Sequence, residues 1–339
     1  MLVEPLLSNQ RLPNCVNPPA TAGLGLLSAA SWGGSDFIGG LGARRAPVLL
    51  VVASGHLVSL LVLLAVCLGA HLTLPGRHDL FFAAIGGFEG AIALALFYRA
   101  LALGAMGLTA ALTGLLTALV PVLFSLLHDG LPTPVSAIGL ALGLAAIWLI
   151  THSPAATAPE PETTESSQQS SVPRPFRAFG EKDGKPQLSA APTLTDRATS
   201  EAAFTPPAAL LLAALAGLGF GTQLILFKFA SGGGILWIMT SARAAGVAAM
   251  LLVLLVMPPK AVWRGFWLFG ILAGSLDTVG NLFYIQTTRL GRLDVAAMVC
   301  SLYPAGTILL AALVLREWPS RRQFAGIILA LAAVALLSI

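Results

Sequence analysis

The sequence predicts an all-α membrane protein in which ten transmembrane helices form two inverted five-helix repeats. The chain has 339 residues, of which 56% are hydrophobic and 10% charged, and its mean hydropathy is +0.85. A soluble domain of this length does not need so apolar a composition to fill its core. The apolar residues fall into ten runs, and the pattern of these runs repeats in the second half of the chain.

The ten runs have the length of membrane-spanning helices. A bilayer core about 30 Å thick needs roughly 20 apolar residues in a helix. The runs are continuously apolar and lack the alternation of lipid-facing barrel strands, so helices are favoured. In chain order, the expected spans are 21–42, 47–70, 79–102, 107–128, 134–151, 206–229, 235–257, 265–288, 294–315 and 322–339.

Turn-forming residues mark the boundaries between these spans. Gly and Pro, often beside Arg or Asp, interrupt the first five spans at 42–47, 74–77 and 129–132. In the second half, similar residues interrupt the chain at 231–234 and 258–260. Such clusters are typical of loops between helices, so they support the positions of the predicted ends.

Two polar segments lie outside the spans. The tail at 1–20 contains polar residues and prolines in place of a continuous apolar run, which argues against a cleaved signal peptide. The segment at 152–205 is rich in Pro, Ser, Thr and Glu and holds 12 of the 34 charged residues, which predicts a disordered linker. The remaining body is basic, which suits anionic lipid headgroups and does not indicate nucleic-acid binding. The five-helix repeats are therefore expected at 21–151 and 206–339.

An internal repeat supports this division. An offset of 187 residues aligns 97–150 with 284–337 without a gap, and fourteen of the 54 positions are identical. The same offset pairs Gly34 with Gly221. Because each repeat has an odd number of spans, the second copy must enter the membrane from the opposite side. Inverted repeats of this kind are typical of carriers that work by alternating access, with a site near the midplane.

Several motifs resemble a known family. The stretch Ser-Leu-Tyr-Pro-Ala-Gly-Thr-Ile-Leu-Leu-Ala at 301–311, with Glu-Trp-Pro-Ser at 317–320 and Gln-Phe-Ala-Gly at 323–326, resembles the end of an EamA-type domain. Trp-Gly-Gly-Ser at 32–35 resembles the opening of the same domain. EamA-type domains belong to the drug/metabolite transporter superfamily, and the resemblance covers both halves of the chain.

The resemblance is stronger in the second copy than in the first. Thr117 and Gly130 stand in the first copy where the second has Pro304 and Glu317. The resemblance implies a multi-pass carrier of the plasma (cell inner) membrane that moves a small metabolite or drug, usually outward. It also implies cytoplasmic termini, whereas the loop charges lean slightly the other way. A monomer or a homodimer is compatible with the sequence.

Four ionisable residues lie close to the centres of their predicted spans: His56, Glu89, Arg243 and Asp277. A charge at the bilayer centre costs about 2.5 to 3.5 kcal/mol, so such groups normally face a partner or a wet cavity. The offset of 187 pairs His56 with Arg243 and brings Glu89 within one position of Asp277. Each half is thus expected to contribute one basic and one acidic group to a central cavity.

Other polar and aromatic residues extend this candidate site. Asp277, Asn281, Tyr284 and Thr288 follow a spacing that places them on one helix face. Pro121 and Pro304 interrupt the backbone ladder of their spans and are candidate hinges. The expected residues for binding a substrate or proton are Glu89, Asp277, Arg243, His56, Asn281, Tyr284, Trp32 and Tyr303.

These residues favour a secondary carrier for a small molecule, in which Glu89 or Asp277 holds a proton or an amine and couples export to proton entry. Arg243 could equally form a structural ion pair with one of these acids. An intramembrane enzyme using Glu89 and Asp277 and a passive channel or membrane scaffold are the alternatives. The sequence lacks a phosphate-binding G-x-x-x-x-G-K-[ST] loop, and H-E-x-x-H and G-x-S-x-G motifs. No cofactor or metal is expected.

Overall fold

A computed structural model describes residues 18–43, 45–103, 106–151, 207–259, 265–315 and 320–338. These residues belong to one compact unit, and all of their regular structure is helical. The predicted disordered linker at 152–205 and residues 1–17 of the predicted tail lie outside the described residues.

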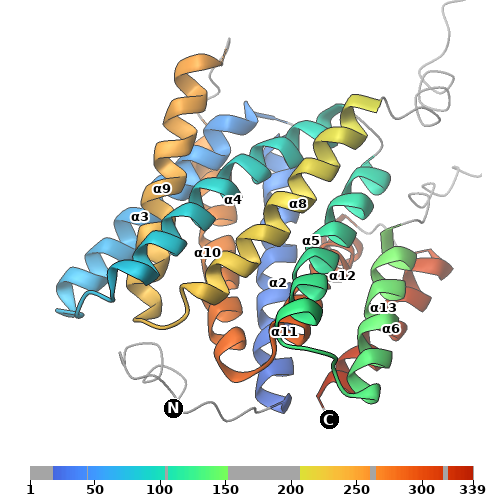
Figure 1. Cartoon of the computed structure of the whole chain (residues 1–339). Coiled ribbons are helices and arrows are strands. Elements are labelled where there is room, and N and C mark those ends of the chain that lie inside the picture. The colour runs from blue at the N-terminus through green and yellow to red at the C-terminus, as the bar shows by residue number, and fades with distance from the viewer. Residues whose placement is uncertain are drawn as a thin grey trace, which may run out of the picture. The chain divides into compact units, whose positions relative to one another are not determined.

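The helices match the expected spans within three residues at each end, with one exception. The first half contains α2 (Pro18–Ala43), α3 (Val48–Gly69), α4 (Arg77–Leu103), α5 (Met106–His128) and α6 (Pro134–Thr151) (Figure 1). The second half contains α8 (Pro207–Phe229), α9 (Ile235–Val256), α10 (Phe266–Leu290), α11 (Leu293–Cys300), α12 (Tyr303–Leu310), a short π-helix (Ala311–Leu315) and α13 (Arg321–Leu337).

The exception is the expected single span at 294–315, which is broken into α11, α12 and the π-helix. The break falls at Ser301 and Leu302, whose amides donate to carbonyls of the last turn of α11. Pro304 stands in the first turn of α12, where its missing N–H costs no helical hydrogen bond. Pro121 instead lies inside α5, which continues to His128. The hinge roles of both prolines stay predictions.

Much of the described chain has the dimensions of membrane-spanning helices. Large apolar side chains such as Leu61, Leu255 and Leu331 are exposed on its outside, as lipid-facing residues would be. Among the residues that the structure describes, six helical stretches are long and apolar enough to cross a membrane, namely Val48–Gly69, Arg77–Ala100, Pro207–Phe229, Ile235–Val256, Phe266–Leu290 and Leu293–Val314. Leu112–His128 and Pro134–Leu149 are shorter apolar helices.

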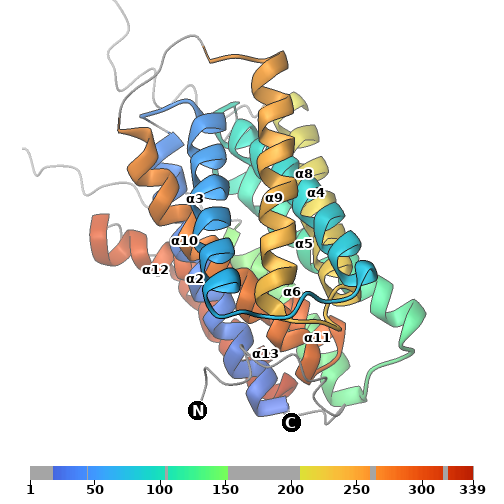
Figure 2. The ribbon, with the colours of Figure 1, turned by 90° about the vertical axis from the view of Figure 1, so that its left-hand side faces the viewer.

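Helices of one half pack mainly on helices of the other. Helix α2 packs on α10 as α8 packs on α4, and α3 packs on α10 as α9 packs on α4. Helix α5 packs on α8, whereas α11 and α12 pack on α2. Helix α3 also lies against α9, as Figure 2 shows, and α6 lies against α13. The main contacts between the halves therefore occur in pairs, in which each helix and its partner are replaced by the equivalent helices of the other half.

Glycines allow two of these helix pairs to approach closely. A Cβ atom added at Gly274 of α10 would meet the backbone of Gly55 in α3. At the positions 187 residues apart, a Cβ atom added at Gly87 of α4 would meet the backbone of Ala242 in α9. Small residues at such crossings are typical of packed membrane helices.

We expect Gly274→Ala to lower the free energy of unfolding by about 1–3 kcal/mol, because the facing backbone cannot move away as a side chain could. Gly40→Ala is the matched control, since a Cβ atom there has no atom within 4 Å. Thermal unfolding of the purified protein in detergent measures both. Equal melting temperatures for the two variants would contradict the close α3–α10 crossing.

Candidate functional site

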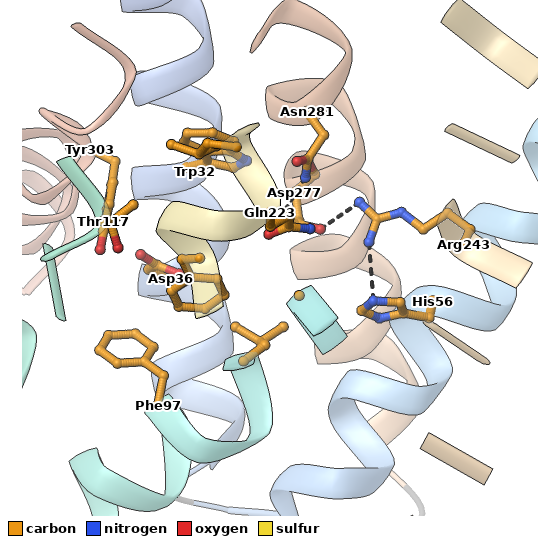
Figure 3. Close-up of a pocket in the computed structure, with 14 residues that line it drawn as sticks. Trp32, Asp36, His56, Phe97, Thr117, Gln223, Arg243, Asp277, Asn281 and Tyr303 are labelled. Atoms are coloured by element: carbon orange, nitrogen blue, oxygen red, sulfur yellow. Dashed lines mark hydrogen bonds and ion pairs between the residues drawn. The ribbon is translucent and has the colours of Figure 1, made fainter. Parts of the chain in front are cut away.

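A polar pocket lies between the two halves of the bundle (Figure 3). About 600 Å³ of space among its lining side chains, part of it open to the outside, holds no protein atom. Helices α2 to α5 contribute walls from the first half, and α8, α9, α10 and α12 contribute walls from the second. The lining residues are Trp32, Asp36, His56, Gly90, Leu94, Phe97, Thr117, Phe220, Gln223, Leu224, Arg243, Asp277, Asn281 and Tyr303.

An ion pair joins α9 and α10 at this pocket. The Arg243 guanidinium donates through Nη2 to Asp277 Oδ2 at 2.5 Å, and its Nη1 lies 3.3 Å from His56 Nε2. His56 Nδ1 lies 3.0 Å from the Val52 carbonyl oxygen, so the neutral tautomer with the proton on Nδ1 satisfies both contacts. Arg243 is nearly fully buried, whereas about a quarter of the Asp277 side chain (24%) is exposed.

Asn281 holds the Asp277 carboxylate in place from one helical turn away. Its Nδ2 donates to the Asp277 backbone carbonyl at 2.7 Å and to Asp277 Oδ1 at 3.2 Å. The two carboxylate oxygens therefore accept from different groups, one from Arg243 and one from Asn281. The sequence alternatives for Arg243 included pairing with Glu89 or with Asp277, and the structure pairs it with Asp277.

The expected polar stripe on α10 divides into two parts. Asp277 and Asn281 line the pocket. Tyr284 is fully buried and donates to the Leu224 carbonyl oxygen at 2.7 Å, and Thr288 donates to the Ile285 carbonyl oxygen. The Tyr284 ring lies beneath the pocket wall, 5.8 Å from the centroid of Trp32. Its hydroxyl therefore supports the wall, and Tyr284 is not among the residues that line the pocket.

Glu89, like Tyr284, is an expected site residue that lies outside the pocket lining. Its side chain is half-buried and does not line the pocket. It faces Gly219 of α8, where an added Cβ atom would lie 3.8 Å from Glu89 Cγ. Gly90 lines the pocket instead, and it is the residue 187 positions before Asp277. A shift of one position turns a helical side chain by about 100°, which removes Glu89 from the matching face.

Of the other expected residues, Trp32, His56, Arg243 and Tyr303 line the pocket together with Asp277 and Asn281. The Trp32 and Tyr303 rings meet edge to face, with their centroids 6.4 Å apart. Tyr303 reaches the pocket because α12 begins at that residue, immediately after the break in the helix. Trp32 occupies the facing position on α2 (Figure 3).

The sequence analysis missed three polar lining residues, Thr117, Asp36 and Gln223, and the last two matter most for binding a solute. Asp36 follows Trp32 by one helical turn, and this spacing is the signal that could have assigned it to the same face. Gln223 is the residue 187 positions after Asp36. Neither side chain makes a hydrogen bond or an ion pair with any residue in the described part of the chain. Both therefore offer unsatisfied polar groups to a solute.

Equivalent positions of the two halves line the pocket from opposite walls. Eight of its lining residues form four pairs separated by 187 positions: Asp36 with Gln223, His56 with Arg243, Gly90 with Asp277, and Leu94 with Asn281. The members of each pair carry different chemistry, so the two walls are equivalent in position and unequal in charge. Within the described ranges, no three His, Cys, Asp or Glu side chains form a group that could hold a metal ion.

Comparisons with known proteins follow the same division of the chain. The sequence model of the EamA-like transporter family matches twice, at residues 20–152 and 207–339. None of the curated proteins matches the chain significantly. A crystal structure described only as that of a protein is similar over 93% of this chain and 95% of its own, with a TM-score of 0.63 and 18% sequence identity. At that identity the similarity concerns the fold alone.

Proposed function

The chain belongs to the EamA-like transporter family and is a multi-pass membrane protein, and from this premise we propose that it is a secondary carrier. It moves a small metabolite or drug through the pocket by alternating access. The observation that carries the proposal is the pocket itself, whose walls come from both matched regions and meet at the Arg243–Asp277 pair. The proposed location is the plasma (cell inner) membrane.

Two inverted five-helix repeats are part of this proposal. They are supported by the two family matches, by the paired helix contacts and by the four lining pairs at an offset of 187. In Figure 1, α2 and α8 run in opposite directions, as equivalent helices of inverted repeats would. Such repeats can exchange conformations, and the exchange opens a central site to each side of the membrane in turn.

The polar groups of the pocket have separate roles in the proposed cycle. The Arg243–Asp277 pair joins α9 to α10 and keeps the second half together around the solute. Asp36 offers a carboxylate without a described partner, and this carboxylate can bind either a proton or a polar group of the solute. Competition between the two would couple outward transport of the solute to inward transport of a proton. Export and proton coupling are thus part of the same proposal as the carrier.

The alternatives from the sequence lead to different observations. An intramembrane enzyme using Glu89 and Asp277 requires both carboxylates at one reacting centre, and Glu89 does not line the pocket that contains Asp277. A passive channel would conduct solute without saturation. Counterflow separates a carrier from a channel or a scaffold, because only a carrier exchanges internal for external solute.

The decisive experiment is counterflow in vesicles containing the purified protein. The vesicles are loaded with a mixture of unlabelled amines, amino acids and carboxylates and diluted into the same compounds in isotopically labelled form. We expect saturable accumulation of at least one labelled compound, detected by mass spectrometry. Gly90→Leu should reduce this uptake at least tenfold, because an added Cβ atom would overlap the Gln223 amide, so that the leucine and the displaced amide would both take up pocket space.

Gly40→Leu is the control for this variant. It makes the same substitution in a helix of the same bundle, at a position where an added Cβ atom has open space. We expect it to keep uptake within about threefold of the original rate. Flux that rises linearly with concentration and ignores the internal solute would refute the carrier, and normal uptake by Gly90→Leu would refute the pocket as its route.

A further inference from the structure

We propose that the solute is an organic cation with a single positive charge and an apolar body, and that its ammonium group binds the Asp36 carboxylate. This inference rests on the carrier function proposed above and names the substrate class of the same pocket. Three features of the described residues carry it: the charge balance of the pocket, the lack of a partner for Asp36, and the aromatic walls.

One ionisable side chain of the pocket has no charged counterpart. Its ionisable side chains are Asp36, His56, Arg243 and Asp277. The charges of Arg243 and Asp277 cancel in the ion pair at 2.5 Å. His56 faces the guanidinium through Nε2 at 3.3 Å and can accept that hydrogen bond only as a neutral ring. Asp36 is therefore the one ionisable group of this lining whose charge, when it is ionised, has no counterpart in the pocket.

Asp36 lies where a charge needs a partner. It makes no hydrogen bond or ion pair with another residue of the described ranges. A carboxylate that loses hydration among packed helices without a compensating contact is unfavourable. A bound ammonium group would supply the contact that the protein does not.

The walls around Asp36 suit the rest of such a solute. Trp32 lies one turn before Asp36 on α2, and its ring meets that of Tyr303 edge to face at 6.4 Å. Phe97 and Phe220 form a second edge-to-face pair at 6.1 Å. Aromatic rings attract ammonium groups and provide apolar contact area.

The same residues disfavour an anionic solute. Arg243 supplies the positive charge of the lining, and it already binds Asp277. A carboxylate solute would have to separate this pair and then lie in the same pocket as Asp36. Gln223, the positional equivalent of Asp36 in the second half, is neutral and therefore gives no preference between cations and anions. The pocket should thus select for positive charge.

Calorimetric titration of the purified full-length protein in detergent at neutral pH tests this selection. The probes are phenethylamine, phenethyl alcohol and hydrocinnamate, which share a phenyl ring and differ in charge. We expect phenethylamine to bind at least about tenfold more tightly than either of the others. Asp36→Asn should weaken its binding roughly 10- to 100-fold, as expected for loss of a charge-assisted contact, and leave the alcohol unaffected.

Two further variants separate binding from folding. Asp36→Glu retains the charge and should recover much of the affinity, while Asp129→Asn makes the same chemical change as Asp36→Asn at an exposed residue after α5 and should bind as the original chain does. Thermal unfolding confirms that each variant is folded. No binding of phenethylamine, equal binding of the three probes, or full affinity in Asp36→Asn would overturn the inference.

The carrier and its substrate class can fail separately. Counterflow of an amino acid or a carboxylate, without phenethylamine binding, would remove the cation site and leave the carrier in place. Selective phenethylamine binding in a protein that shows no counterflow would refute the carrier and leave the cation site in place.

Discussion

Replacing Arg243 with methionine should lower the free energy of unfolding by about 2–3 kcal/mol. The substitution removes the cation from a nearly buried ion pair and leaves the Asp277 carboxylate without its closest partner. Breaking such a pair when both groups are fully buried costs about 3–5 kcal/mol. The lower value follows because about a quarter of the Asp277 side chain (24%) faces the pocket and keeps some hydration. Chemical or thermal unfolding in detergent gives the measurement.

Adding a second substitution to Arg243→Met separates the effect of the ion pair on stability from its effect on transport. Arg243→Met combined with Asp277→Leu removes both charges, and we expect it to recover most of the lost stability, because uncharged side chains of similar size often replace buried ion pairs without loss. Transport should be abolished in the single variant and in the double variant. A single Arg243→Met variant as stable as the original chain would show that the pair does not hold α9 against α10.

Asp277→Asn should reduce counterflow roughly 100-fold while the protein stays folded. The amide keeps the shape of the side chain, and its oxygen can still accept from Asn281 Nδ2 as Asp277 Oδ1 does, so the bundle can close around it. The Arg243 guanidinium, however, loses its counter-charge and becomes free to face the solute or Asp36. A loss of 2–3 kcal/mol at this contact corresponds to a decrease of this size. Initial rates of labelled uptake measure it, with thermal unfolding as the check on folding.

Glu89→Gln is the matched control for Asp277→Asn. Both acids lie close to the centres of their predicted membrane spans, and either substitution replaces a carboxylate with an amide. Because Glu89 does not line the pocket, we expect its variant to retain counterflow within about threefold of the original rate. Similar losses in both variants would mean that Glu89 reaches the solute or carries a coupled proton. Unchanged uptake in both would remove Asp277 from the binding site.

Most of the fold could be predicted from the sequence because the lipid environment restricts it. Apolar runs of fixed length and turn residues between them were enough to place helix ends within three residues for nine of the ten expected spans. The span at 294–315 could not be resolved in this way. The helix breaks just before Tyr303, which lines the pocket, and this position depends on tertiary packing. Pro304 does not predict the break by itself, because a proline fits either a kink inside one helix or the first turn of a new helix.

The candidate site could be predicted only in part. Charged residues such as Arg243 and Asp277 stood out because charge is rare in an apolar helix. Glu89 carried the same signal, but its direction depends on one position of helical register, and composition does not contain that information. Asp36 was visible one turn from Trp32, yet assigning it required knowing that this face of α2 turns inward. Thr117 and Phe97 give no such signal, because small polar and aromatic residues occur on every face of membrane helices.

The break between α11 and α12 has no equivalent in the first half, where α5 runs without interruption from Met106 to His128. A discontinuous helix can bend locally at its free peptide groups, while a continuous one must tilt as a rod. Entry and exit would then be opened by different movements and cross barriers of different height. The solute concentration that half-saturates transport would consequently differ between the two sides of the membrane.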